Sequence, residues 1–176
     1  IIGVEDKSGF EIDLAIHTYE IPHQWPVDVV EQTRQFPETV SEADCVDRVD
    51  LRHLPFITID AQSARDFDDA IYVEALPEGG WTLWVAIADV GYYVPVGTPI
   101  DLEAQKRGTS VYFPQRVIPM LPEALSDQLC SLQPDCDRLA VVARLDVNQA
   151  GEVTTRAFLR AVIHSHARLT YIEVIQ

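Results

Sequence analysis

The segment FITIDAQSARDFDDAIYV, residues 56–73, is the most informative stretch of this sequence. Its β-branched beginning, residues 56–60, predicts a short strand that ends at an acid, and the alternating residues 70–76 predict a second strand. A loop that turns back between these two strands brings four carboxyl groups to one place. The four aspartates are Asp60, Asp66, Asp68 and Asp69.

Four unpaired carboxylates within a few ångströms repel one another, and the single Arg65 between them cannot neutralise the cluster. A divalent cation can, and Mg²⁺ prefers oxygen ligands, keeps several waters and binds substrate phosphates. Two such ions about 4 Å apart can activate water and stabilise the leaving oxygen of a phosphodiester. The segment therefore predicts a magnesium site suited to phosphodiester cleavage.

Two other interpretations of this loop stay open at this point. Acid-rich loops are often simple solvated turns, and this spacing is compatible with one. A phosphatase nucleophile of the Asp-x-Asp type could lie at Asp66 and Asp68, although the strand expected before such a nucleophile ends at Asp60 instead. An EF-hand is excluded, because Ala70 follows Asp69 and the loop has no matching glutamate.

The chain of 176 residues is acidic, with a formal net charge of -15 at pH 7. Charge of this sign repels phosphate backbones, which disfavours nucleic-acid binding through the surface as a whole. The 47% of hydrophobic and 23% of charged residues are typical of a globular protein and exclude disorder, collagen and coiled coil as descriptions of the chain.

The sequence predicts a cytoplasmic protein without a membrane partner. No apolar run approaches the roughly 20 residues that a transmembrane helix needs, and the N-terminus lacks a signal pattern. The three cysteines, Cys45, Cys130 and Cys136, have no Cys-x-x-Cys spacing, which argues against zinc and fits a reducing compartment. Because the chain starts without Met and stops in an unfinished pattern, we expect an internal piece of a longer protein.

The rest of the pattern predicts an α+β fold with a mixed, mainly antiparallel sheet and flanking helices. Asp89, in an apolar strand, is expected to be a buried structural acid with a partner. Residues 12–16 fit either a short helix or an edge strand. The expected strands are residues 56–60, 70–76, 81–90, 139–147 and 152–165, with extended segments at 110–114 and 116–122. The expected helices are residues 27–35, 100–106 and 123–132, with one further turn that starts at Ser41 and has Asp44 three residues on.

Several motifs resemble, in order, the catalytic domain of the ribonuclease II/ribonuclease R family. The acidic segment resembles the opening of that domain, and WVAIADV, residues 84–90, resembles the strand that follows. The segments RGTSVYFP at 107–114 and IPMLPE at 118–123 continue the match, and ARLTY at 167–171 closes it. Within the family the likeness is greatest to the bacterial ribonuclease R branch.

This resemblance implies a Mg²⁺-dependent, processive 3′→5′ exoribonuclease that hydrolyses RNA to nucleoside 5′-monophosphates. Carried over by position, Asp60, Asp66 and Asp69 are the implied metal ligands. Asp68 is implied to be the catalytic aspartate, whose loss stops cleavage while RNA binding largely remains. Non-catalytic RNA- or protein-binding relatives, and unrelated metal phosphohydrolases, are the alternatives.

The resemblance also implies a partner and the residues that bind it. The partner is the 3′ end of single-stranded RNA, and DNA is not expected as the main substrate. Tyr112 matches the tyrosine that packs on the 3′-terminal nucleotide, where stacking holds any base at about 1–3 kcal/mol without reading its identity. Independently of the resemblance, Arg107 flanks Tyr112 and is expected to contact RNA phosphates, with a solvated surface position as the alternative.

The family likeness further predicts how the chain is divided. Residues 1–20 are expected to be the end of a cold-shock, OB-type domain, a short remnant of a β-barrel. Residues 21–50 are expected to be a linker with a helix, and residues 51–176 the N-terminal half of the RNB catalytic domain. The later half of that domain supplies an arginine near the scissile phosphate, and flanking modules supply basic surface. We therefore expect these 176 residues alone to be an inefficient nuclease.

Overall fold

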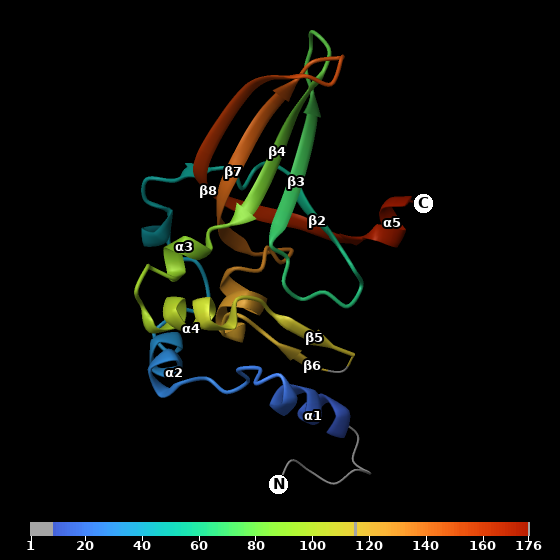
Figure 1. Ribbon diagram of the computed structural model, residues 1–176. Helices are drawn as coiled ribbons and strands as arrows, with labels where there is room; N and C mark the ends of the chain where they lie inside the picture. The colour runs from blue at the N-terminus through green and yellow to red at the C-terminus, as the bar shows by residue number, and fades with distance from the viewer. Residues whose placement is uncertain (1–8, 115, 176) are drawn as a thin grey trace. The chain divides into compact units, whose positions relative to one another are not determined.

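A computed structural model describes residues 9–114 and 116–175 (Figure 1). The chain divides into two compact units. The first unit combines the N-terminal stretch that ends at Phe36 with Val94–Glu123. The second unit combines Pro37–Tyr93 with Ala124–Gln176 and carries the acidic segment.

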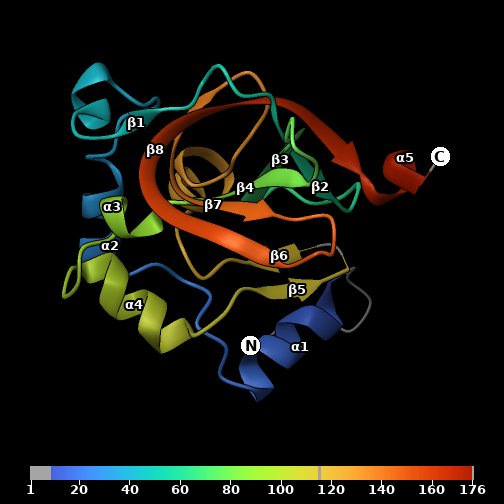
Figure 2. The ribbon, with the colours of Figure 1, turned by 90° about the horizontal axis from the view of Figure 1, so that it is seen from above.

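The second unit is built on one sheet of six strands, in the order β1-β8-β2-β3-β4-β7. An additional pairing joins β7 to β8, so that the sheet closes on itself through five of its strands. Figure 2 shows β8 curving around this ring, seen from above. The strands are β1 (Val49–Asp50), β2 (Phe56–Asp60), β3 (Asp69–Ala75), β4 (Trp81–Ala88), β7 (Asp137–Val147) and β8 (Val153–Thr170). The predicted α+β fold with a mixed, mainly antiparallel sheet is confirmed.

The 18-residue strand β8 closes the ring because its two edges have different partners. Its first part pairs antiparallel with β7, from Val153 opposite Val147 to His164 opposite Asp137. Its last part pairs parallel with β2, so that Arg168 lies opposite Thr58. The end of β8 therefore runs beside the strand that leads into the acidic segment.

The antiparallel hairpin β3–β4 fits the turn predicted at residues 77–80. The pairing runs from Asp69 opposite Ile87 to Ala75 opposite Trp81. Gly80 has a φ of +92°, and a Cβ at this position would lie 2.2 Å from the carbonyl oxygen of Val147. Both the backbone angle and the close approach of β7 require glycine here.

The described interior of the second unit is mainly apolar, and it contains a buried ion pair. Phe56, Leu139 and Ile163 have no exposed surface, and burial of such side chains is the main stabilising contribution to a core. Asp89 is 7% exposed, and its carboxylate lies 2.7 Å from the guanidinium of Arg48. The prediction that Asp89 is a buried structural acid with a partner is thus confirmed.

Short helical turns complete the second unit. They are η1 (Glu42–Cys45), α3 (Val90–Tyr93), the π-helix η2 (Leu125–Leu129) and α5 (Tyr171–Ile175). The predicted turn after Ser41 is η1, and the reciprocal bonds of Ser41 and Asp44 form a capping box. The helix predicted over 123–132 begins at Glu123 as expected, but it ends at Leu129, and residues 125–129 form a π-helix.

The first unit contains three helices and a small hairpin among its described residues. They are α1 (Phe10–Thr18), α2 (Val27–Thr33), α4 (Pro99–Arg107), β5 (Val111–Phe113) and β6 (Arg116–Ile118). Thr98 caps α4 by accepting a hydrogen bond from the backbone N–H of Asp101, and Gly108 ends the helix with a φ of +74°. The side chain of Gln32 on α2 accepts a hydrogen bond from the N–H of Ile100, which joins the two helices.

Helix α1 settles the question that residues 12–16 left open, in favour of a helix. Residues 10–18 therefore do not form a strand of the expected β-barrel remnant. Residues 1–8 lie outside the described part of the chain. The assignment of residues 1–20 to a cold-shock domain stays a prediction. No helix among the described residues is both long enough and apolar enough to cross a bilayer.

Candidate functional site

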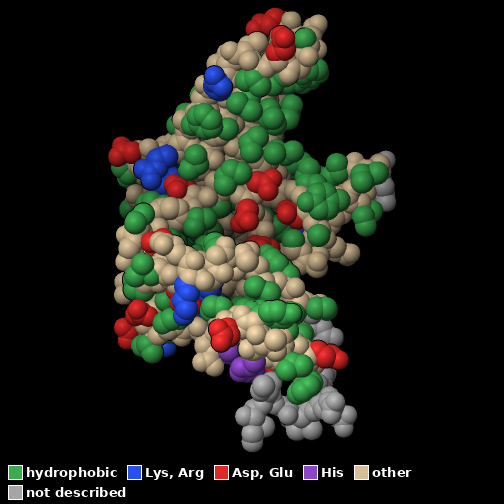
Figure 3. Space-filling view, in the orientation of Figure 1, with side chains coloured by type: hydrophobic (Ala, Val, Ile, Leu, Met, Phe, Trp, Pro, Cys, Tyr) green, Lys and Arg blue, Asp and Glu red, His purple; other side chains and the backbone are tan. Residues whose placement is uncertain are grey.

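The connection from β2 to β3 carries the four predicted aspartates, and we call residues 60–69 the acid loop. Asp60 is the last residue of β2 and Asp69 is the first residue of β3. Asp66 and Asp68 lie on the irregular segment between them. Figure 3 shows acidic side chains close together on the visible face, where Figure 1 places the start of β3.

The carboxyl groups of the acid loop act on one another electrostatically. The pKa of Asp60 is raised, first by desolvation and then by the charges of Asp69 and Asp66, while Arg168 opposes the shift. The pKa of Asp68 is also raised, first by desolvation and then by Asp66, Asp69 and Asp60. Each of these carboxylates thus disfavours the charge of its neighbours, as expected for acids that share a small volume.

The donor set is chemically suited to Mg²⁺, because it consists of carboxylate oxygens that repel one another without a cation. In the described residues, however, no three His, Cys, Asp or Glu side chains stand close enough together to hold a metal ion as they are arranged here. The loop therefore brings the acids within electrostatic range without forming a finished coordination sphere.

Ser131 holds the second half of the acid loop. Its buried hydroxyl accepts a hydrogen bond from the N–H of Phe67 at 3.1 Å and donates one to the carbonyl of Arg65 at 2.8 Å. The N–H of Leu132 donates to the carbonyl of Phe67, and that of Ala88 donates to the carbonyl of Asp68. The backbone on both sides of Asp66 is thereby attached to the core.

Arg168 holds the first half of the loop from β8. Its Nη2 donates to the carbonyl oxygens of Ala61, Gln62 and Ala64. Sequence reasoning missed both Arg168 and Ser131 as residues of the site. The motif ARLTY contains Arg168, but nothing in the local pattern says that its side chain reaches a loop about a hundred residues earlier.

The two residues predicted to bind RNA differ in their surroundings, and both lie in the first unit. Tyr112, on β5, is 62% exposed, so a base could reach its ring. The side chain of Arg107 is 3% exposed and donates to Glu103 and to the carbonyls of Pro119 and Gln24. Each of its three guanidinium nitrogens already has an acceptor here, and the prediction that Arg107 contacts RNA stays a prediction.

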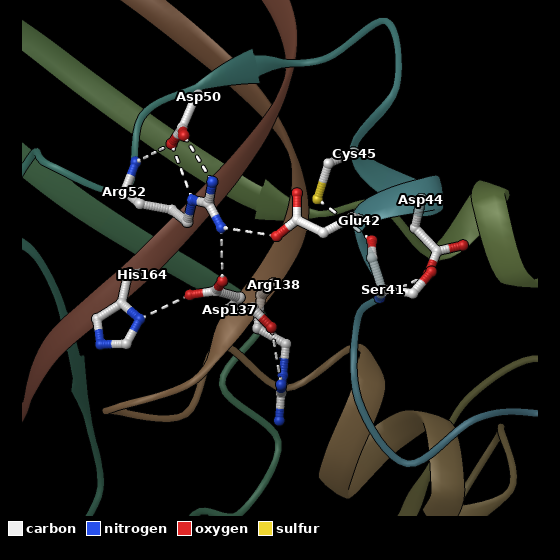
Figure 4. Close-up of polar contacts among 9 residues, drawn as sticks. All are labelled: Ser41, Glu42, Asp44, Cys45, Asp50, Arg52, Asp137, Arg138 and His164. Atoms are coloured by element: carbon white, nitrogen blue, oxygen red, sulfur yellow. Dashed lines mark hydrogen bonds and ion pairs between the residues drawn. The ribbon is translucent and has the colours of Figure 1, made fainter.

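A second polar cluster, centred on Arg52, also lies in the second unit (Figure 4). Arg52 pairs with Asp50 at 2.7 Å and with Asp137 at 3.0 Å. Burial raises the pKa of Asp137, but hydrogen bonds from His164 and Arg52 outweigh burial and hold this pKa below its usual value. The cluster joins β1, β7 and β8, and we interpret it as a structural network.

Comparison with known proteins connects this architecture to a family. The model of the RNB domain matches residues 48–176. Ribonuclease R of Escherichia coli (strain K12) is 53% identical over 174 residues, and the match covers 99% of this chain and 21% of that protein. Ribonuclease R of Acidithiobacillus ferrooxidans is 49% identical, with 99% of this chain and 39% of that protein covered.

Solved structures agree with this result. Mycoplasma genitalium RNase R in complex with ribose methylated single-stranded RNA aligns with a TM-score of 0.90 and 36% identity, over 98% of this chain and 27% of that one. The same enzyme in complex with double-stranded RNA aligns with a TM-score of 0.91 and 35% identity, over 99% and 31%. The chain thus spans about a fifth of the E. coli relative and under a third of these structures. Its domain match and its identity to these relatives show that the chain belongs to the RNB domain family and is a homologue of ribonuclease R.

Proposed function

We propose that this chain is part of a Mg²⁺-dependent exoribonuclease that hydrolyses single-stranded RNA processively from its 3′ end and releases nucleoside 5′-monophosphates. The observation that carries the proposal is the acid loop, whose four aspartates act on one another in a homologue of ribonuclease R. Family membership supports nuclease chemistry, and the acids supply the means to perform it at this site.

In this proposal Asp60, Asp66 and Asp69 hold the metal, and the raised pKa of Asp60 supports a need for a cation beside it. The bound metal would neutralise the scissile phosphate and lower the pKa of an attacking water. Without metal, the loop's own charge would repel the substrate's phosphates, so RNA binding at this site should depend on the cation.

Asp68 is proposed to be the catalytic aspartate, whose carboxylate accepts the proton of the attacking water. Its raised pKa makes this carboxylate a better proton acceptor than an ordinary aspartate. The Asp68 side chain is exposed, so substrate can reach it, while its backbone carbonyl is held by the N–H of Ala88 at 3.0 Å. Loss of its carboxylate should stop hydrolysis and leave the binding of RNA largely intact.

Tyr112 is proposed to stack on the base at the 3′ end of the RNA. Its exposed ring supports this proposal, because stacking needs an accessible aromatic face and tolerates every base. An enzyme that degrades RNA of any sequence needs this tolerance. Arg107 has no part in the proposal, since its guanidinium is occupied inside the first unit.

The test uses the full-length gene product that contains these residues, with a 5′-labelled single-stranded RNA and Mg²⁺. We expect the label to pass from full-length RNA to a short end product with few intermediates, as processive degradation requires, nucleoside 5′-monophosphates to accumulate, and EDTA to stop both. Asp68→Asn should abolish shortening but still shift the RNA in a binding gel. Asp47→Asn is the matched control, because it removes one exposed carboxylate elsewhere and asparagine tolerates the φ of +61° at this position.

Each result of this test has a distinct meaning. RNA that is bound but never shortened by the wild type would support the non-catalytic alternative and reject the enzyme. Cleavage at internal sites would reject the exonuclease. Equal activity of Asp68→Asn and wild type would remove Asp68 from the site while leaving the nuclease assignment in place.

A further inference from the structure

We propose that Arg168 is a positioning residue, whose hydrogen bonds to the backbone of the acid loop hold the carboxylates in the arrangement that binds the metal. The inference rests on the function proposed above and adds a residue outside the acid loop to its machinery. It follows from two observations: the backbone carbonyls of the acid loop that Arg168 contacts, and its stacking on Phe67 in the other half of that loop.

The first observation is that one nitrogen of Arg168 donates hydrogen bonds to three backbone carbonyl groups. Nη2 lies 3.2 Å from the oxygen of Ala61, 2.7 Å from that of Gln62 and 3.4 Å from that of Ala64. These carbonyls converge because the chain turns here, with the N–H of Ala64 donating to the carbonyl of Ala61 at 3.0 Å. Charged donors make stronger hydrogen bonds than neutral ones, so this contact stabilises the turn that directly follows Asp60.

Arg168 also links the two halves of the loop. Its guanidinium carbon lies 4.9 Å from the centre of the Phe67 ring, and Phe67 is 5% exposed. The second half of the loop is attached to the core by Ser131. Arg168 therefore sets the position of the turn after Asp60 relative to the segment that carries Asp66 and Asp68.

The sign of the charge makes the inference testable. If Arg168 acted on the metal only through its charge, its removal would strengthen cation binding, because a positive group near a cation site repels the cation. If Arg168 positions the loop, its removal must weaken cation binding, because the carboxylates lose their mutual arrangement. A loop that is less ordered loses more conformational entropy when its carboxylates are fixed around a cation, and this loss weakens binding.

The experiment measures Mn²⁺ binding to the metal-free, full-length gene product by electron paramagnetic resonance, without RNA. The Asp66→Asn variant defines which part of the signal belongs to the acid loop. We expect Arg168→Met to bind Mn²⁺ about tenfold more weakly than the wild type, the lower range for loss of a residue that supports metal ligands. Arg168→Lys keeps the charge but loses the planar group over Phe67. Its Mn²⁺ affinity should therefore lie between that of Arg168→Met and that of the wild type.

Arg144→Met is the matched control. Arg144 has the same charge, stacks at 5.4 Å over Trp84 and pairs with Asp146, so its loss changes the same kinds of contact in the second unit. Its Mn²⁺ affinity should equal that of the wild type within twofold. Amide hydrogen exchange of residues 61–67, measured without metal, should be faster in Arg168→Met and unchanged in Arg144→Met.

The outcomes separate this inference from the function on which it rests. Wild-type protein that shows no Mn²⁺ signal dependent on Asp66 would overturn the proposed metal site, and the inference with it. Wild-type binding together with equal or tighter binding by Arg168→Met would overturn the inference alone. Unchanged exchange of residues 61–67 in Arg168→Met would also overturn it, because the loop would then keep its structure without the arginine.

Discussion

Replacing Ser131 by alanine should loosen the acid loop without disturbing the rest of the second unit. Ser131 is fully buried, and the substitution removes one hydroxyl while it keeps the Cβ, so no large cavity forms. The N–H of Phe67 loses its acceptor, and the carbonyl of Arg65 loses its donor. Since Arg65 is exposed, water can replace the lost donor there, whereas Phe67 is 5% exposed and its N–H is left unpaired.

The size of this effect follows from the N–H of Phe67, which the substitution leaves without an acceptor. A buried polar group without a partner costs about 1–3 kcal/mol, and every 1.4 kcal/mol is a factor of ten, so the loop should open about 5- to 150-fold more often. When reclosing is fast, the exchange rate of an amide hydrogen follows the population of the open state. The exchange of peptides that cover residues 64–70 should therefore accelerate by this factor.

Hydrogen exchange followed by mass spectrometry is the assay, with Ser126→Ala as the control. Ser126 lies nearby in sequence, and its hydroxyl donates to the side chain of Asp127 instead of to the loop. Equal exchange of residues 64–70 in Ser131→Ala and wild type would refute the assigned contact. Acceleration over the entire second unit would show that Ser131 stabilises the fold as a whole and not the loop.

Three further predictions follow from other contacts. Arg48→Met leaves the buried carboxylate of Asp89 with only the exposed Arg160, at 3.8 Å, and should cost up to about 3–5 kcal/mol, seen as a lower melting temperature in calorimetry, with part of the loss restored by adding Asp89→Asn. Gly80→Ala places a Cβ against the carbonyl of Val147 at a left-handed φ and should lower the melting temperature by the equivalent of about 2 kcal/mol or more; an unchanged transition would contradict the turn. Tyr112→Ala should weaken binding of single-stranded RNA in a filter assay by about 1–3 kcal/mol, whereas Tyr112→Phe should bind like the wild type. Equal binding by all three proteins would exclude stacking at this tyrosine.

Local signals in the sequence predicted most elements of the second unit. The strand over residues 56–60 was predicted with its observed bounds, and the turn after Ser41 was predicted from its capping residues. Such signals are reliable because β-branched runs and caps act over a few neighbouring residues. The helix expected over 123–132 begins at Glu123 but ends at Leu129, and its backbone adopts a π pattern at residues 125–129, which residue types alone do not specify.

Arg107 shows what the tertiary structure adds to a motif at a single residue. Its segment matched the family, and an arginine near a tyrosine that is predicted to bind substrate suggests a phosphate contact. In the structure its charge is paired with Glu103 one helical turn away, and its guanidinium carbon lies 3.5 Å from the centre of the Trp25 ring. A pattern read along the chain could not reveal that a tryptophan far from it in sequence would cover this side chain.

The sequence by itself determined the functional groups of the candidate site and the family: four aspartates in ten residues, the strands on either side of them, and motifs shared with a family of ribonucleases. Only the tertiary structure decided how the acids are held. The long strand β8 closes the sheet and brings Arg168 to carbonyls 104 to 107 residues earlier, and Ser131 reaches a carbonyl 66 residues earlier. Contacts over such separations depend on how the whole sheet pairs, because no local propensity encodes which distant side chain meets a given loop.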